Sequence, residues 1–176
     1  MKKKIILVGT SHTIQNNLNN FNFRNYIKKL AIKNRVKIIA EEMKTKDDTV
    51  GKIISIKLKI KHLIIEPTDD EKIKLNIKKV GYIQWCFMSK YEMEYLNIKD
   101  LDDSKLNEYK REVEKTYRQR EKEWFRRIKK VDKYPILIIC GACHVKPFYK
   151  LLKSKSLFVN IKNKRWGVYG KIECLK

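Results

Sequence analysis

Residues 4–12 read KIILVGTSH and residues 135–144 read PILIICGACH, and these two stretches decide the fold. Each begins with a short, continuous apolar run, which is typical of a strand buried on both faces of a parallel sheet. Each run leads into a glycine that is followed three residues later by a histidine. The sequence therefore predicts two buried strands that each deliver a Gly-x-x-His motif at their carboxyl ends.

Further apolar segments of similar length extend this pattern along the chain. The predicted strands are Lys3–Gly9, Val36–Ala40, His62–Glu66, Pro135–Cys140 and Leu157–Ile161. The predicted helices are Phe21–Lys33, Asp47–Lys57, Asp69–Tyr95 with a break near Gly81, Asp102–Lys130 and Val145–Lys153. Strands that alternate with helices predict an α/β fold, with a mainly parallel sheet of about five strands and helices on both faces. We expect one domain, spanning residues 1–176.

Length and composition restrict the class of protein. The chain has 176 residues, of which 43% are hydrophobic, and it contains only six glycines and three prolines, so collagen-like and disordered classes are excluded. Its apolar runs are far shorter than the roughly 18 residues that a membrane span needs. The basic start resembles that of a signal peptide, but its apolar run ends after five residues. We expect a soluble, cytoplasmic protein without a membrane partner.

The net charge of +22 makes nucleic acid the first partner to consider. However, 34 of the 42 basic residues are lysines, and they are scattered along the whole chain. This pattern is typical of an AT-rich genome, whereas nucleic-acid sites usually concentrate arginine and aromatic residues. A nucleic-acid partner is therefore the less favoured interpretation, and a small anionic substrate fits the charge equally well.

Polar residues follow four of the predicted strands, where a parallel α/β sheet binds its ligands. They are His12 with Ser11 and Gln15, Glu41 with Glu42, Glu66, and His144. Histidine serves as a general base near neutral pH or as a metal ligand, and carboxylates orient histidines or complete a metal shell. The sequence thus predicts one site at the carboxyl edge of the sheet.

The long predicted helix Asp102–Lys130 has one irregularity in its apolar stripe. The stripe continues from Tyr117 to Trp124, and the position expected between them holds Arg120 or Glu121. A charge at a core-facing position is costly unless it is paired. Either the arginine stem covers apolar surface while its head reaches water, or its guanidinium enters the predicted site and holds an anion.

Four motifs in this order resemble a known superfamily. They are Gly9-Thr10-Ser11-His12, Glu41-Glu42, Arg120-Glu121-x-x-Trp124, and Cys140-Gly141-x-x-His144 with Phe148 beyond. The superfamily contains the TIKI and TraB/PrgY proteins, the ChaN haem-binding proteins and the erythromycin esterases, and the chain is most similar to its short bacterial members. Those members lead us to expect Asp-Pro and then Glu-Arg after the third strand, where this chain has Glu66-Pro67 and Glu71-Lys72.

The resemblance implies a hydrolase-like pocket lined by two histidines, a glutamate and an arginine. We expect His12, His144, Glu41 and Arg120 to be catalytic, and we favour Glu41 over Glu42 because consecutive side chains diverge. Further substrate contacts are expected from Ser11, Gln15, Glu42, Glu66, Glu121 and Trp124. If the reaction is metal-assisted, the ligands of a Mn²⁺, Co²⁺ or Zn²⁺ ion would be His12, Glu41 and His144; haem is a less favoured cofactor. The substrate would be an ester or amide in a small anionic molecule or a peptide.

Two alternatives from other classes remain at this point. The pocket could bind a small anionic, nucleotide-like or haem ligand without catalysis, or the protein could be a basic nucleic-acid binder. The segment Cys140–His144 also matches C-x-x-C-H, the motif that attaches c-type haem. This motif can also be interpreted as a redox pair of cysteines or as a zinc site. We instead expect Cys140 to be a small residue within the strand and Cys143 to fill a turn. His62 is expected to be structural. The aromatic segment that contains Trp85, Phe87, Tyr91 and Tyr95 either lines a pocket or packs in a core, and we expect the core.

Overall fold

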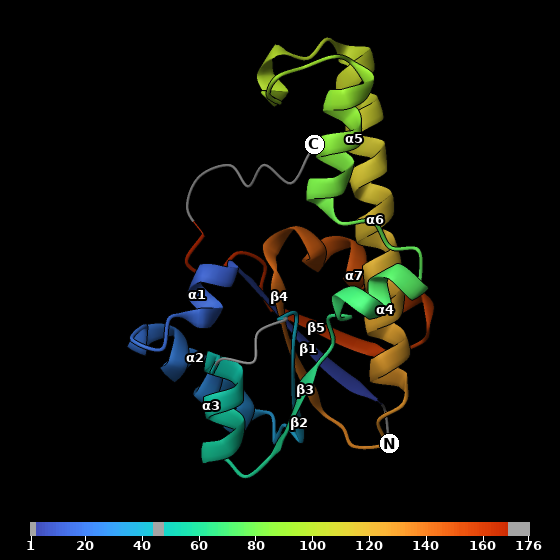
Figure 1. Cartoon of the computed structure of the whole chain (residues 1–176). Coiled ribbons are helices and arrows are strands. Elements are labelled where there is room, and N and C mark those ends of the chain that lie inside the picture. The colour runs from blue at the N-terminus through green and yellow to red at the C-terminus, as the bar shows by residue number, and fades with distance from the viewer. Residues whose placement is uncertain (1–2, 44–47, 169–176) are drawn as a thin grey trace. The chain divides into compact units, whose positions relative to one another are not determined.

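The computed structural model describes residues 3–43 and 48–168 (Figure 1). Its strands are β1 (Lys4–Thr10), β2 (Ile38–Glu41), β3 (Lys61–Ile64), β4 (Ile136–Gly141) and β5 (Phe158–Asn163). Its α-helices are α1 (His12–Asn16), α2 (Phe21–Lys33), α3 (Val50–Lys57), α4 (Asp69–Lys74), α5 (Val80–Lys90), α6 (Asp103–Lys129) and α7 (Val145–Ser154). Two short 3-10 helices, η1 (Ile98–Asp100) and η2 (Ala142–His144), complete the described elements.

The five strands form one parallel sheet in the order β3-β2-β4-β1-β5. The two strands with the Gly-x-x-His motifs are neighbours, and Gly9 pairs with Cys140 while Thr10 pairs with Gly141. In both strands the apolar residues are completely buried, because parallel strands covered on both faces have no solvent side. The predicted α/β fold with a parallel sheet of five strands is confirmed.

Two apolar clusters lie on the two faces of the sheet. Side chains alternate along β1, so that Ile5 and Leu7 enter one cluster while Ile6 and Val8 enter the other. The first cluster contains Trp124 of α6 with Val145, Phe148 and Leu152 of α7. The second contains residues of α2 and α3: Phe23, Ile27, Ala31, Val50 and Ile54. Helices therefore cover both faces of the sheet, as expected.

Side-chain caps explain why several helices begin where they do. Ser11, Asn20, Thr49 and Thr68 each accept a hydrogen bond from a backbone N–H in the first turn of the following helix. At Thr68 the glutamate three residues later reaches back to the cap backbone, which completes a capping box. These polar residues satisfy donors that the helix itself leaves unpaired.

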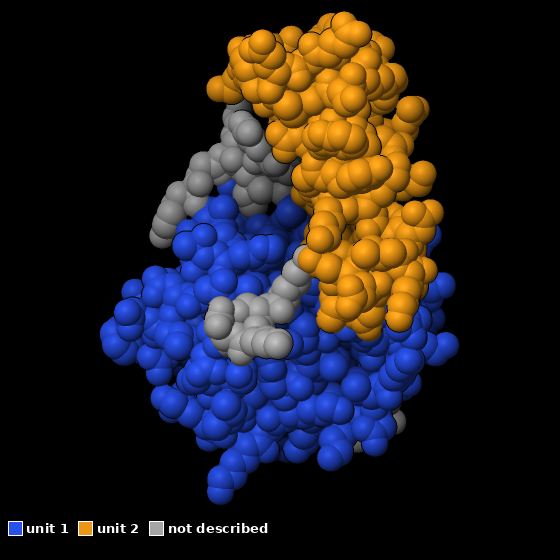
Figure 2. Space-filling model, in the orientation of Figure 1, with its two compact units in different colours: residues 1–66, 121–172 blue, residues 67–120, 173–176 orange. Residues whose placement is uncertain are grey.

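The chain divides into two compact units, which Figure 2 colours separately. Unit 1 comprises residues 1–66 and 121–172 and contains the sheet; unit 2 comprises residues 67–120 and 173–176. Unit 2 has its own apolar cluster, built on Ile83, Phe87, Tyr109 and Val113. Phe87 and Tyr91 pack there as expected. Trp85 and Tyr95 are 63% and 70% exposed, so the expectation that they pack in a core is corrected.

Among the described residues, no helix is both long enough and apolar enough to cross a membrane. The longest helix, α6, is rich in charged residues along its 27 positions. Cys174, the last of the four cysteines in the sequence, lies outside the described residues.

Candidate functional site

Two histidines reach the carboxyl edge of unit 1 because β1 and β4 are adjacent. His12 is the first residue of α1, which Ser11 caps by accepting a hydrogen bond from the Ile14 N–H at 3.3 Å. His144 ends η2, directly after β4. The side chain of His12 is 57% exposed, whereas that of His144 is 3% exposed. One histidine therefore faces solvent and the other lies inside.

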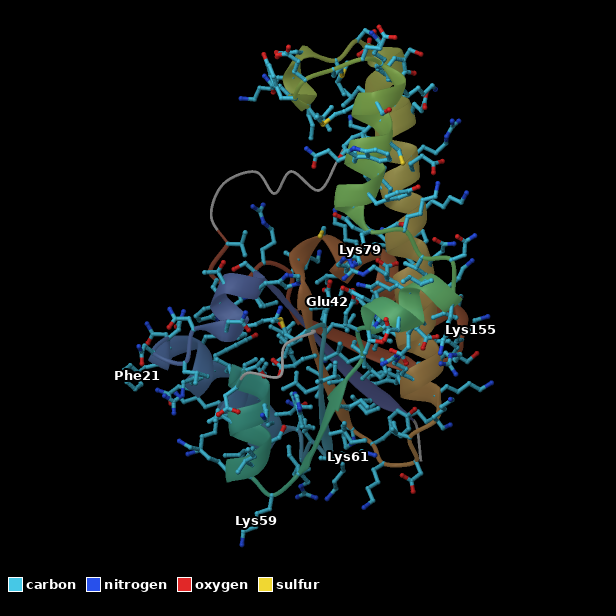
Figure 3. The ribbon with its side chains drawn as sticks, in the orientation of Figure 1. Phe21, Glu42, Lys59, Lys61, Lys79 and Lys155 are labelled. Carbon is cyan, nitrogen blue, oxygen red and sulfur yellow. The ribbon has the colours of Figure 1, made fainter. Side chains whose placement is uncertain are left out.

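Glu42, which Figure 3 labels, has one carboxylate oxygen close to both histidines. Its Oε1 atom is 3.4 Å from His144 Nε2 and 3.6 Å from His12 Nε2. Its second oxygen, Oε2, accepts a hydrogen bond of 2.7 Å from the Gly141 backbone N–H. This carboxylate is only 2% exposed, so its contact with the buried His144 lies out of water, whereas the imidazole of His12 has solvent on its other side. Low solvent exposure strengthens such polar contacts.

A second buried carboxylate holds the other nitrogen of His144. Glu121 Oε1 lies 2.8 Å from His144 Nδ1, and the Glu121 side chain is 2% exposed. The ring of Trp124, one turn further along α6, meets the His144 ring at 4.8 Å and 65°. Trp124 Nε1 in turn donates to Glu66 Oε2 at 2.9 Å. The ring of His144 is therefore fixed by polar partners on both sides and by an aromatic edge.

Glu41, the carboxylate that we favoured from the sequence, lies elsewhere. It is fully buried and accepts hydrogen bonds from Thr49 Oγ1 and from the Gly51 backbone N–H at the start of α3. His62 Nε2 lies 2.8 Å from Glu41 Oε2. Successive strand residues point to opposite faces, so Glu41 faces α3 when Glu42 faces the histidines. The preference for Glu41 over Glu42 is therefore corrected.

The set of metal ligands expected from the sequence is not brought together. Glu41 is held by α3 and His62, and both nitrogens of His144 lie close to carboxylate oxygens. Among residues 3–43 and 48–168, no group of three or more histidine, cysteine, aspartate or glutamate side chains is arranged to hold a metal ion.

Gln15, expected to contact substrate, is completely buried one turn beyond His12 on α1. Within the part of the chain that the structure describes, neither its Nε2 nor its Oε1 atom has a hydrogen-bond partner. A buried amide in this state costs about 1–3 kcal/mol relative to a satisfied one. Its contact with a substrate stays a prediction.

Arg120 belongs to unit 2, next to the boundary with unit 1. Its guanidinium carbon lies 5.8 Å from the centre of the Tyr117 ring, in a cation–π contact. Of the two residues at the gap in the apolar stripe of α6, Glu121 is the one buried beside His144. The role of Arg120 as an anion holder stays a prediction.

Sequence reasoning found the residues of this cluster but missed two of its contacts. Glu121 was assigned to substrate, whereas its carboxylate holds His144. The signal was present, because Glu121 continues the spacing of Val113 and Tyr117 on the core-facing side of α6. The hydrogen bond from the Gly141 N–H to Glu42 had no comparable signal, since it depends on which strands are neighbours.

Comparison of the chain with protein-family models, with curated protein sequences and with solved structures yields no match. The likeness to the superfamily of TIKI, TraB and ChaN proteins therefore rests on the sequence motifs and stays a prediction. The fold and the site define a parallel α/β protein with a His–Glu–His–Glu cluster at the carboxyl edge of its sheet. The cluster is formed by His12, Glu42, His144 and Glu121.

Proposed function

We propose that this protein is a hydrolase that cleaves an ester or amide bond by general acid–base catalysis at His12. The observation that carries the proposal is the shared oxygen of Glu42, which lies within 3.6 Å of both histidines. His12 is the exposed member of the cluster, so a substrate can reach its ring. The Glu42 carboxylate lies 3.6 Å from His12 Nε2, where it favours the protonated form of the ring that arises during the reaction, and solvent hardly reaches it.

The reaction needs only water and the substrate. His12 removes a proton from a water molecule, and the water oxygen forms a bond to the carbonyl carbon, whose electron pair moves to the carbonyl oxygen. When the tetrahedral intermediate collapses, the bond to the leaving group breaks and the imidazolium of His12 returns the proton to that group. General acid–base catalysis of this kind contributes about 10²–10⁴-fold to a rate.

The buried part of the cluster supports this chemistry by keeping Glu42 and His144 in fixed positions. A neutral imidazole donates through one nitrogen only, while His144 has carboxylate oxygens on both sides. These contacts at both nitrogens hold the imidazole of His144 in place, and His144 in turn holds Glu42 beside His12. We assign Glu121 and His144 as positioning residues, because they act on the substrate through Glu42.

The test is the hydrolysis of a panel of p-nitrophenyl acyl esters and N-acyl p-nitroanilides by purified protein. We expect His12→Ala to reduce kcat/KM by about 100-fold or more, and Glu42→Gln to lower kcat more than it raises KM. His62→Gln is the matched control, because His62 contacts Glu41 outside the cluster, and its rate should equal that of the wild type. Circular dichroism and the melting temperature establish that each variant is folded.

Two results would overturn the proposal. One is an unchanged rate in folded His12→Ala protein. The other is the absence of turnover of the whole panel, together with an intact small molecule that native mass spectrometry detects on the wild type but not on His12→Ala. That second result would instead favour a binding protein without catalysis.

A further inference from the structure

The net charge of the chain belongs almost entirely to one unit. Unit 1 has 29 lysines and arginines against 8 aspartates and glutamates, a net charge of +21. Unit 2 has 13 against 12, a net charge of +1. The positive field of the protein therefore originates from the unit that contains the sheet and the histidine cluster.

A lysine-rich genome does not explain this difference. Basic residues make up about a quarter of the positions in both units, which is what a uniform bias in codon usage produces. Acidic residues occur at about one position in fifteen in unit 1 but at about one in five in unit 2. The two units are translated from one gene, so the scarcity of acids in unit 1 needs a cause of its own.

The structure makes the contrast sharper, because the glutamates of unit 1 are inside it. All five are at most 5% exposed: Glu41, Glu42, Glu66, Glu121 and Glu123. Of the described residues of unit 1, only Asp48 and Asp132 are exposed acids, and Asp48 is paired with Lys52 at 2.8 Å. Twenty-one described lysines and arginines of the unit are exposed. In unit 2, by contrast, no acidic residue of the described part is buried.

The exposed cations of unit 1 extend over helices on both faces of the sheet. Helix α2 presents Lys28, Lys29 and Lys33, and α7 presents Lys146, Lys150 and Lys153. Figure 3 shows Lys59 pointing away from the ribbon, whereas Glu42 lies at the strand ends. One or two cations are enough for a small anion, and a bilayer contacts one side of a protein. Cations on both faces instead fit a long, flexible polyanion.

We propose that unit 1 binds nucleic acid through its phosphate backbone, without preference for sequence. Lysine is a flexible point charge that contacts phosphates and carries little base specificity, and it supplies most of this surface. Phe21 on α2 is 66% exposed with the Arg24 guanidinium 5.5 Å from its ring, and such an exposed ring is a surface on which a base can stack. The proposal goes beyond the hydrolytic site and does not rest on it.

The test is fluorescence anisotropy with labelled RNA and DNA of about 20 nucleotides, single-stranded and duplex, in KCl from about 50 to about 200 mM. Neutralising about four phosphates of a single strand gives a slope of log K against log salt near −3, which is a loss of about 50-fold or more over this range. Two strands of unrelated sequence should bind equally. The RNA, DNA and duplex arms show which form of the backbone is preferred.

Three triple variants, which all have the same net charge, show which part of the surface binds the nucleic acid. Lys28→Gln/Lys29→Gln/Lys33→Gln changes α2, and Lys146→Gln/Lys150→Gln/Lys153→Gln changes α7. In the control, Lys74→Gln/Lys99→Gln/Lys115→Gln removes three exposed lysines from unit 2. We expect at least one of the unit 1 variants to make the slope shallower by about 2, and we expect the unit 2 variant to keep the slope of the wild type. Charges more than about 8 Å from a phosphate are largely screened at physiological salt.

Several outcomes contradict the proposal. They are a slope shallower than about −1, equal losses of affinity in all three variants, and an unchanged slope in both unit 1 variants. Tighter binding to polyglutamate or to vesicles of anionic phospholipid at the same salt concentration would assign the surface to another polyanion. The binding assay uses no hydrolysis, so His12→Ala protein should bind like the wild type, and failure of the hydrolase proposal leaves this result unaffected.

Discussion

Units 1 and 2 use acidic side chains in opposite ways. In unit 1 the glutamates are buried and form hydrogen bonds with histidines, a tryptophan indole and backbone N–H groups. In unit 2 acidic residues lie at the surface and pair with lysines, as in Lys79–Asp69, Lys90–Glu108 and Lys105–Asp102. Exposed pairs contribute little to stability, whereas a buried carboxylate that loses its partner is costly. In this protein the burial of an acidic side chain therefore determines whether it holds the core together or forms an exposed ion pair.

The largest effect is expected at Glu121. Replacing it by alanine removes the partner of His144 Nδ1 and leaves a buried polar ring nitrogen, so we expect a loss of about 4 kcal/mol in the free energy of unfolding. The matched change in unit 2 is Glu112→Ala on the same helix, at a half-buried position. Urea unfolding followed by circular dichroism measures both. Equal losses of unfolding free energy in the two variants would contradict the view that buried acids of unit 1 contribute more to stability than the acids of unit 2.

The next comparison uses two glycines at equivalent helix positions. Gly51 and Gly81 are both the second residue of a helix that begins Val-Gly. A Cβ atom on Gly51 would lie 2.3 Å from the Glu41 carboxyl carbon, whereas a Cβ atom on Gly81 meets nothing within 4 Å. We expect Gly51→Ala to destabilise by about 2 kcal/mol, because the buried carboxylate loses its place. Gly81→Ala should stabilise by about 0.5 kcal/mol.

Urea unfolding of the two glycine variants measures both effects. Because the two expected changes have opposite signs, a general effect of replacing glycine by alanine cannot explain both. If Gly51→Ala left the free energy of unfolding unchanged, Glu41 would be able to move without cost. It would also contradict the assignment of Glu41 as a fixed, structural carboxylate at the start of α3.

A smaller effect of opposite sign is expected at Gln15. Since its buried amide has no hydrogen-bond partner among the described residues, Gln15→Met should raise the free energy of unfolding by about 1 kcal/mol. For a chain of this size, that is an increase of about 3 °C in melting temperature. Gln84→Met at a half-buried position of unit 2 is the control and should be neutral. A decrease for Gln15→Met would mean that the amide has a partner, such as an ordered water molecule.

The smallest effect concerns pH. The hydrogen bond from Arg126 and then that from Arg127 hold the pKa of Glu123 below its ordinary value of 4.5. A carboxyl whose pKa is lowered in the folded state stabilises the fold above its ordinary pKa, and this contribution is lost as the pH falls through the lowered value. The difference in melting temperature between wild type and Glu123→Gln should therefore shrink below pH 4.5.

The matched carboxyl in unit 2 is Glu108, whose pKa is lowered by Lys90 and then by Tyr91. Its side chain is 29% exposed, against 5% for Glu123. We expect high salt to abolish the pH-dependent difference for Glu108→Gln but to leave a measurable part of it for Glu123→Gln, because salt screens exposed pairs more. If both differences vanish in salt, the burial of Glu123 has no electrostatic consequence.

Much of the fold was predictable because its signals are local. The helix Phe21–Lys33 was predicted with the bounds that the structure has, and the break near Gly81 falls where α5 begins. The predicted ends of the five strands lie within two residues of the observed ends. This agreement is expected, because each strand is a short apolar run and the polar residues on either side mark where it begins and ends. The order of the strands could not be read, because it depends on which distant segments pack together.

The candidate site was predictable to the level of its neighbourhood. Parallel strands bring their carboxyl ends to one edge, so the residues that follow them had to meet there. The preference for Glu41 over Glu42 was wrong, because a shift of one residue along a strand moves a side chain to the opposite face of the sheet and the sequence does not show which face the histidines occupy. The tertiary structure shows that Glu42 accepts the hydrogen bond of the Gly141 N–H and lies close to both histidines, whereas Glu41 accepts that of the Gly51 N–H.

The sequence by itself determined the alternation of strands and helices, the two Gly-x-x-His motifs and the excess of lysine, since each is a property of neighbouring residues or of composition. The tertiary structure alone decided that His144 lies between Glu42 and Glu121, residues that are 79 positions apart in the chain. It also decided that the glutamates of unit 1 lie inside, while none of the lysines that the structure describes in this unit is buried. Burial and pairing depend on contacts between distant segments, and such contacts exist only once the chain has folded.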